Sequence, residues 1–246
     1  MANKGVGYEI AKYLHHHPET QVVAIFLTGV DEIYDKKILN LFKGGSVLIY
    51  AGERPHDKLE VLEKLPVFDY IVTVFWPYLL KPEIISLAKE SSVNFHPALL
   101  PINRGWYPHV FNILNQTKAG VTLHCIDNGV DTGPIWTQKE VPVYTSDTSD
   151  KLYYRLQGEI VTLFCKSWDE IIGNRIEPTP QDHERASYNS IRDVQEYDRI
   201  HLDSSYTGRD IINRLRARTF GNKGYAYFVD DDGKKIEVSI SLEESQ

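Results

Sequence analysis

Cysteine is scarce in this chain, whose 246 residues include only Cys125 and Cys165. Two thiols form at most one disulfide, which excludes the disulfide framework that holds small secreted domains together. No uninterrupted apolar run approaches the roughly 18 residues of a transmembrane helix. No basic segment followed by an apolar one opens the chain, as it would in a secretory signal. These features predict a cytoplasmic protein.

Glycine and proline, with 16 and 12 residues, are too few for a fibrous or low-complexity chain. Positive charge is limited as well, because 27 Lys and Arg stand against 34 Asp and Glu and leave a net charge of −7. This balance argues against a broad surface for nucleic acid or anionic membranes, although it is compatible with a local phosphate pocket. The length is sufficient for a sizeable core without covalent cross-links.

The first half of the chain alternates between two patterns. Near-continuous apolar runs, typical of strands covered on both faces, lie at residues 22–28, 47–50 and 70–75. Stretches with a helical pattern lie at residues 7–17, 33–42, 57–65 and 82–90. Strands and helices that alternate in this way predict an α/β fold with a Rossmann-like, doubly covered and mostly parallel sheet.

The front of the chain departs from this pattern. The segment NKGVGYE is a glycine-containing turn followed by a helix, which normally follows a strand, yet only three residues precede the turn. Either the first strand is a short stub, or the true start lies upstream of Met1.

The second half changes character. Residues 120–126 and 135–143 have β-type composition, and a long helix is predicted at 148–172. The EPTP segment at 177–180 cannot continue a helix, so we place the boundary of a core at residue 178. Residues 179–246 then form a small α+β extension, with a helix at 210–218. It ends in a β-hairpin, in which residues 225–229 and 235–241 flank Asp-Asp-Asp-Gly.

Polar residues concentrate between Asn94 and Gly133. Residues 92–95 predict a short strand, and because side chains alternate along a strand, Asn94 and His96 point the same way. They would lie at the carboxyl end of a strand, where open α/β sheets place ligands. An Asn-x-His pair on its own is more often a capping amide and a half-buried structural histidine.

Two segments follow this pair. Residues 97–108 (PALLPINRGWYP) contain three prolines and predict a rigid, irregular segment whose single cation, Arg104, suits a phosphate or a surface ion pair. Residues 126–133 (IDNGVDTG) predict a tight loop that lets a ligand approach the backbone. Asp127 and Asp131 have the spacing of a cation loop, but the further ligands of a calcium site are missing, so no metal is expected.

Together, NFHPALLP-INRGWYP and the later GVTLHCIDNGVDTGPIW resemble the 10-formyltetrahydrofolate-dependent formyltransferase family. The family pattern is an Asn-x-His-Pro strand end, an Arg-Gly-x-x-Pro loop and a His–hydrophobic–Asp…Asp-Thr-Gly-Pro-Ile run. The resemblance covers residues 1–175. The RGWYPHV segment and the tail ERASYNSIRD…NRLRARTFGNKGYAYF are most similar to bacterial sugar-nucleotide N-formyltransferases, in which residues 1–178 would be the catalytic core.

The resemblance implies transfer of a formyl group from 10-formyltetrahydrofolate, as co-substrate, to the amine of a dTDP-linked aminodideoxysugar. The preferred acceptor is dTDP-4-amino-4,6-dideoxyglucose, and the 3-amino isomer and a UDP carrier stay open. Such products enter the O-antigen of lipopolysaccharide or other surface polysaccharides. The resemblance also implies a catalytic trio of Asn94, His96 and Asp131. Asn94 would hydrogen-bond the developing oxyanion, His96 would accept the proton of the amine, and Asp131 would orient the imidazole.

Ligand contacts are implied in the same way. Expected folate contacts are Phe75, Trp76, Tyr78, Leu80, Asp127 and Val130, and expected sugar-nucleotide contacts are Arg104, Trp106, Tyr107 and Arg216. The plainer alternatives are that the aromatic residues pack in the core and that Arg216 belongs to a solvated helix face. His124 is interpreted as a structural histidine in the middle of a strand.

Other functions remain as alternatives. A methionyl-tRNA formyltransferase is disfavoured by the acidic balance and the short tail. The RGWYP loop and the tail speak against a formyltetrahydrofolate hydrolase or a glycinamide-ribotide formyltransferase. A non-catalytic folate or sugar-nucleotide binding module would not need the complete trio. Alternating Tyr225, Tyr227 and Phe228 predict a hairpin edge that a second subunit covers, and hence a homodimer through the C-terminal region.

Overall fold

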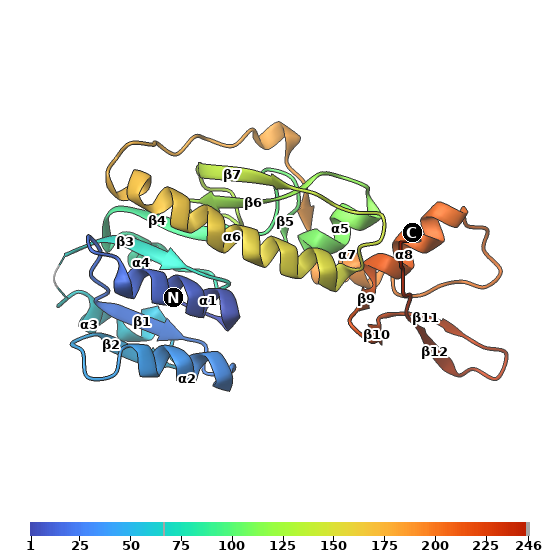
Figure 1. Cartoon of the computed structure of the whole chain (residues 1–246), viewed down its shortest axis with the longest axis horizontal. Coiled ribbons are helices and arrows are strands. Elements are labelled where there is room, and N and C mark those ends of the chain that lie inside the picture. Colours follow the sequence, from blue (N-terminus) through green and yellow to red (C-terminus); the bar gives the residue numbers. More distant parts are fainter. Residues whose placement is uncertain (66, 245–246) are drawn as a thin grey trace. The chain divides into compact units, whose positions relative to one another are not determined.

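The structure is a computed structural model that describes residues 1–65 and 67–244 (Figure 1). The chain divides into two compact units, which are described separately below. Unit 1 consists of Met1–His96, Thr122–Gln138 and Ile160–Gln181, and unit 2 consists of Pro97–Val121, Lys139–Glu159 and Asp182–Gln246. Unit 2 thus takes in two segments that precede the boundary predicted at residue 178. The division into a catalytic core at residues 1–178 and an extension at residues 179–246 assigns functions to the two parts, and it remains a prediction.

The order of the elements along the chain is shown by colour in Figure 1. The α-helices are α1 (Lys4–His16), α2 (Glu32–Leu41), α3 (Leu59–Leu62), α4 (Pro82–Ile85), α5 (Pro108–Leu114), α6 (Ser149–Ile172), α7 (Ile191–Gln195) and α8 (Gly208–Ala217). The strands are β1 (Ala24–Leu27), β2 (Leu48–Ala51), β3 (Phe68–Thr73), β4 (Ala88–His96), β5 (Arg104–Gly105), β6 (Ala119–His124), β7 (Ile135–Val141), β8 (Tyr188–Asn189), β9 (Thr219–Phe220), β10 (Lys223–Gly224), β11 (Ala226–Val229) and β12 (Lys235–Val238). Short 3₁₀ turns lie at Pro55–Lys58 and His183–Arg185.

The strands of the first half pair in parallel, as the sequence predicts. β1 pairs with β2, and β3 pairs with β4. The order of the four-stranded sheet is β3-β4-β6-β7, and β4 pairs with β6 in antiparallel orientation. This confirms the α/β class. The antiparallel pair comes where the sequence stops alternating between strands and helices.

Side chains of β1 enter two different clusters. Ile25 and Leu27 pack with Ile38 of α2, whereas Phe26 packs with Ile71 of β3. Successive residues of a strand point to opposite faces, so the two clusters lie on the two faces of the strand. The prediction of a strand covered on both faces is therefore confirmed for β1.

Two helix predictions are wrong. The helix predicted at 82–90 ends at Ile85, and β4 begins at Ala88 and is much longer than the strand predicted at 92–95. Pairing of Ala88 with Phe68 holds these residues extended, so the ladder outweighs their local helix propensity. The helix predicted at 57–65 is a 3₁₀ turn followed by one α-helical turn, Leu59–Leu62.

The tail forms the predicted helix α8 and the predicted hairpin. β11 and β12 are antiparallel, and Asp230 accepts hydrogen bonds from the backbone N–H groups of Asp232 and Lys234 in the turn. Gly233 has a φ of +79°, a conformation that glycine adopts without strain. Among the described helices, none is both long enough and apolar enough to cross a membrane.

Candidate functional site

The candidate site in unit 1 begins with the pairing of β4 and β6. In this antiparallel pair Asn94 lies opposite His124, and His96 lies opposite Thr122. His96 and His124 are buried, and Asn94 is half-buried. His124 is the last residue of β6 and not in the middle of a strand, so its side chain comes from a strand end beside Asn94.

The carboxylate of Asp131 lies between the two histidines. Its Oδ2 atom is 3.4 Å from Nδ1 of His96, and its Oδ1 atom is 3.5 Å from Nε2 of His124. The Asp131 side chain is only 13% exposed, so this charge is weakly screened by water. The predicted trio of Asn94, His96 and Asp131 therefore comes together in unit 1, with His124 as a fourth member.

Hydrogen bonds define the orientation of the Asn94 amide. Its Oδ1 accepts from the hydroxyl of Thr73 at 2.7 Å, and its Nδ2 lies 3.0 Å from Nε2 of His124. Nδ1 of His124 lies 2.7 Å from the carbonyl of Cys125, which can only accept, so Nδ1 carries the proton and Nε2 accepts from Asn94. Within the described residues, the second N–H of the Asn94 amide has no partner and can donate to a ligand.

The loop that carries Asp131 is tightly folded. Asp127 Oδ1 accepts from the Gly129 N–H at 3.0 Å and from the Thr132 hydroxyl at 2.6 Å. Asp131 has a φ of +54°, a left-handed conformation that Asp tolerates better than most residues. A Cβ atom at Gly133 would lie 2.0 Å from the Cys125 carbonyl oxygen, so only glycine fits there.

Gln181 holds this loop from another part of unit 1. Its buried side chain donates from Nε2 to the carbonyl oxygens of Asp131 at 2.9 Å and Gly133 at 2.6 Å. The sequence interpretation missed Gln181, because a glutamine in a polar segment carries no local signal. It also missed the role of Thr73. The place of His124 two residues before the IDNGVDTG loop is a signal that would have found it.

Cys125 does not provide a nucleophile. It lies just after β6, and its thiol is 3.4 Å from the Ser91 hydroxyl. Burial raises the pKa of the Cys125 thiol, which keeps it protonated near neutral pH.

The expected folate contacts also lie in unit 1. Phe75 has a φ of +48°, and its carbonyl accepts from Nδ2 of Asn3. The Trp76 ring meets Tyr78 edge-to-face at 5.6 Å, and its indole nitrogen is buried without a hydrogen-bond partner among the described residues. Trp76 and Leu80 pack on the cluster that contains Phe26. Asp127 is exposed and Val130 is half-buried in the loop described above.

Three of the four expected substrate contacts, Arg104, Trp106 and Tyr107, lie in one short segment of unit 2. Arg104 is buried, and its Nη2 lies 3.1 Å from Nδ1 of His183. Trp106 and Tyr107 are 46% and 39% exposed, with ring centroids 6.0 Å apart. Large aromatic side chains left exposed in this way are suited to contact a ligand.

Arg216 is anchored inside unit 2. It donates to the carbonyl oxygens of Asp147 and Tyr144, both at 2.8 Å, and to Oδ1 of Asn213 at 3.1 Å. Burial lowers the pKa of its guanidinium. The alternative of a solvated helix face is wrong for Arg216, because its side chain ties α8 to the segment before α6. Its contact with substrate stays a prediction.

The polar cluster in unit 1 combines groups with complementary chemistry. The amide of Asn94 can donate to an oxygen that gains negative charge, and the imidazole of His96 can accept a proton beside the Asp131 carboxylate. This set suits acyl transfer through a tetrahedral intermediate without a covalent bond to the protein.

Comparison with known proteins agrees with this chemistry. Residues 32–166 match the family described as formyl transferase, and residues 193–244 match the N-formyltransferase dimerization C-terminal domain. A dTDP-4-amino-4,6-dideoxyglucose formyltransferase of Mycobacterium tuberculosis is 37% identical over 152 residues. This match spans 61% of the chain and 64% of the relative.

Two solved structures match a larger share of the chain than this relative does. A 4-N formyltransferase from Francisella tularensis superposes with a TM-score of 0.80 at 28% identity, covering 96% of this chain and 93% of the other. An N-formyltransferase from Helicobacter canadensis, solved with folinic acid and dTDP-3-aminofucose, has a TM-score of 0.66 at 26% identity, covering 88% and 78%. The family match spans more than half of the sequence, and the chain therefore belongs to the formyl transferase family.

Proposed function

We propose that the protein transfers a formyl group from 10-formyltetrahydrofolate to the amino group of a dTDP-linked aminodideoxysugar. The observation that carries the proposal is the cluster of Asn94, His96 and Asp131 in unit 1. Support for the substrates comes from the relatives, one named for a dTDP-4-amino sugar and one solved with folinic acid and a dTDP-3-amino sugar. By name the first favours dTDP-4-amino-4,6-dideoxyglucose as the acceptor.

The reaction needs no redox partner. The neutral amine of the sugar forms a bond to the formyl carbon, and the carbonyl oxygen gains negative charge that the free N–H of Asn94 stabilises. His96 accepts the proton from the attacking nitrogen, and the Asp131 carboxylate stabilises the resulting cation. The oxyanion then collapses, the bond from the formyl carbon to the folate nitrogen breaks, and that nitrogen takes up the proton from His96, which returns to its neutral form.

For the folate co-substrate, we propose that residues 75–80 and the loop at 127–131 form the pocket. The buried indole N–H of Trp76, which lacks a partner among the described residues, supports this assignment, because a ligand acceptor would satisfy it. A pterin ring also needs apolar walls, which Trp76 and Leu80 can provide. For the sugar nucleotide, we propose Arg104 as a phosphate contact, Trp106 and Tyr107 as stacking surfaces, and Arg216 as a further contact.

An assay of acceptors tests the proposal. The purified protein is mixed with 10-formyltetrahydrofolate and a panel of dTDP- and UDP-linked 3-amino and 4-amino sugars, and products are identified by mass spectrometry. We expect one formyl group to be added to a dTDP-aminosugar. A parallel reaction offers initiator methionyl-tRNA as the acceptor, and its formylation in preference to every sugar would favour the methionyl-tRNA alternative.

Gln181 offers a prediction about loop placement. In Gln181→Ala, the carbonyls of Asp131 and Gly133 lose their shared donor, so the carboxylate of Asp131 is held less firmly beside His96. We expect kcat for formyl transfer to fall by up to about 100-fold, because small displacements of reacting groups are costly. The exposed Gln195 at the end of α7 provides a matched control, and Gln195→Ala should keep its activity. Equal kcat for the two variants would contradict the positioning role.

We also propose a homodimer through the C-terminal region. Residues 193–244 match a dimerization domain, and Tyr225 and Ile236 on the hairpin are 40% and 38% exposed. Light scattering at micromolar concentration should report twice the mass of the chain. Replacing Ile236 by a charged residue (Ile236→Glu) should shift the mass towards the monomer, and a monomer for the unaltered protein would end the proposal.

A further inference from the structure

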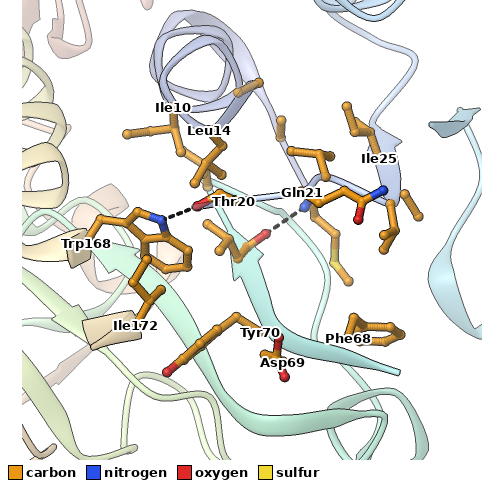
Figure 2. A pocket seen from close by; sticks show the side chains of 18 of the residues that line it. Ile10, Leu14, Thr20, Gln21, Ile25, Phe68, Asp69, Tyr70, Trp168 and Ile172 are labelled. Carbon is orange, nitrogen blue, oxygen red and sulfur yellow. Dashed lines mark hydrogen bonds between the residues drawn. The ribbon is translucent and has the colours of Figure 1, made fainter. Parts of the chain in front are cut away.

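A pocket of about 620 Å³ lies in unit 1, and it is not suited to an anionic ligand (Figure 2). Figure 2 shows large side chains of α1 and α6 around it, such as Leu14 and Trp168. Among the described residues that line it, the charged side chains are the carboxylates of Glu19, Asp69 and Glu90. Carboxylates repel a diphosphate, so this pocket does not compete with unit 2 as the place of the phosphate contact.

The proposed phosphate contact, Arg104, belongs to a segment that a later stretch of the chain holds in place. Strand β5 pairs with β8 in parallel. The Arg104 N–H donates to the Ser187 carbonyl, and the Trp106 N–H donates to the Asn189 carbonyl, both at 2.9 Å. We call residues 183–189 the strap. The strap and the segment it holds both belong to unit 2.

The strap fits closely against the segment around Arg104. A Cβ atom at Gly105 would lie 2.5 Å from the Asn189 carbonyl oxygen, and Gly105 has a φ of +85°. The Asn189 amide donates to Oδ1 of Asn103 at 2.9 Å, and the Asn103 N–H donates to the Ser187 hydroxyl at 2.8 Å. Backbone and side-chain hydrogen bonds thus fix the main chain on both sides of Arg104.

His183, at the start of the strap, contacts the guanidinium of Arg104. Its Nδ1 lies 3.1 Å from Nη2 of Arg104. A guanidinium only donates hydrogen bonds, so Nδ1 accepts, and the proton of the neutral ring is on Nε2. The backbone of His183 lies in a 3₁₀ turn whose first residues are capped, because Oδ1 of Asp182 accepts from the Glu184 N–H at 3.1 Å.

We propose that His183 is a positioning residue for the sugar nucleotide, which orients the guanidinium of Arg104 towards the diphosphate. The inference rests on the proposed function, because it takes a nucleoside diphosphate sugar as the ligand. A guanidinium binds a phosphate through two parallel N–H groups, so the plane of the group decides the contact. An acceptor at Nη2 sets this plane before the ligand arrives, which reduces the freedom that Arg104 loses on binding.

The competing interpretation is that His183 only stabilises the strap. The hydrogen bonds from residues 103 and 104 to the strap involve Ser187 and not His183, so they remain when the imidazole is removed. The His183 side chain is also exposed, and an exposed ring buries little apolar surface. The unfolding temperature of His183→Ala should therefore change little, while ligand binding changes.

Binding of dTDP-glucose, measured by calorimetry, tests the inference without the chemical step. This ligand has the diphosphate but no amine. We expect His183→Ala to raise its Kd about 10-fold, the usual loss for one hydrogen bond to a charged group. His183→Asn keeps an acceptor near the place of Nδ1 and should stay within about threefold of the unaltered protein. His201→Ala, at an exposed position of the same unit, is the control and should bind normally.

A double-mutant cycle shows whether His183 acts through Arg104. In an Arg104→Gln background, His183→Ala should have no further effect on Kd, because the group that it orients is gone. Arg104→Lys provides a second background, in which a cation remains without the planar fork. Unfolding temperatures are measured for all variants, since Arg104 is buried.

The pH dependence of binding gives a separate readout. A second proton on His183 would occupy Nδ1, remove the acceptor and place a cation beside Arg104, and histidine ordinarily changes charge between about pH 5 and pH 8. The other charged side chains of this turn are Asp182, Glu184 and Arg185. Both phosphates of dTDP-glucose are diesters and stay ionised. We expect its Kd to rise as the pH falls through this range, and to rise less in His183→Asn.

Equal Kd values for the unaltered protein and His183→Ala would overturn the inference. So would binding by His183→Asn as weak as that of His183→Ala, or an equal effect of His183→Ala with and without Arg104. These results leave formyl transfer untouched, since the acceptor assay tests it separately. Failure of the unaltered protein to bind any dTDP- or UDP-linked sugar would instead contradict the proposed function together with this inference.

Discussion

His96→Ala is expected to lower kcat/KM for formyl transfer by about 10²- to 10⁴-fold, the usual contribution of a positioned general base. The variant leaves the attacking amine without a proton acceptor, and Asp131 loses the imidazole 3.4 Å away. KM for the folate should change little, because the imidazole is assigned to proton transfer and not to holding the pterin. Steady-state kinetics with saturating 10-formyltetrahydrofolate measure both quantities.

The control for this prediction is His16→Ala. His16 is exposed at the end of α1, where its ring lies 2.8 Å from the Lys12 carbonyl and meets the His15 ring edge-to-face. Its removal should leave activity unchanged. Because His96 is buried, the unfolding temperature of His96→Ala and of the more conservative His96→Asn must also be measured. If both variants folded and stayed within a few-fold of the unaltered protein, His96 would not be the base.

Asn94→Asp should lower kcat by about 10²- to 10³-fold, comparable to removing one oxyanion donor in other enzymes. The aspartate keeps the shape of the side chain and can still accept from Thr73, but it has no N–H to offer. Its negative charge would also repel the oxyanion. Rapid-quench kinetics under single-turnover conditions isolate this effect on the chemical step.

The matched control is Asn40→Asp, the same change at an exposed position of α2. Asn94→Ala complements it by removing the donor without adding charge, and it should also be slow. An Asn94→Asp variant with unchanged single-turnover rate would show that the oxyanion is stabilised elsewhere.

Local pattern was sufficient for the α/β class, the hairpin and the placing of Asn94 and His96 on the same side of one strand, whereas Asp131 was joined to them only through the resemblance to the formyltransferase family. Alternation along β4 is a property of a short segment, and the structure places Asn94, His96 and Asp131 in one cluster. Their catalytic role stays a prediction that the variants above test.

Pairing between distant segments accounts for what local pattern missed. His124 joins the cluster because β6 runs antiparallel to β4, and Gln181 reaches a loop 50 residues earlier in the chain. The helix predicted at 82–90 failed for the same reason, since pairing with β3 draws Ala88 into a strand. No periodicity within one segment carries this information.

The most direct test of the proposed function is the mass spectrum of dTDP-4-amino-4,6-dideoxyglucose after incubation with the protein and 10-formyltetrahydrofolate. We predict a product that carries one added formyl group, formed only when both substrates and an intact His96 are present. If no aminosugar of the panel gained a formyl group while 10-formyltetrahydrofolate was merely hydrolysed or left intact, the account of a sugar N-formyltransferase would be contradicted.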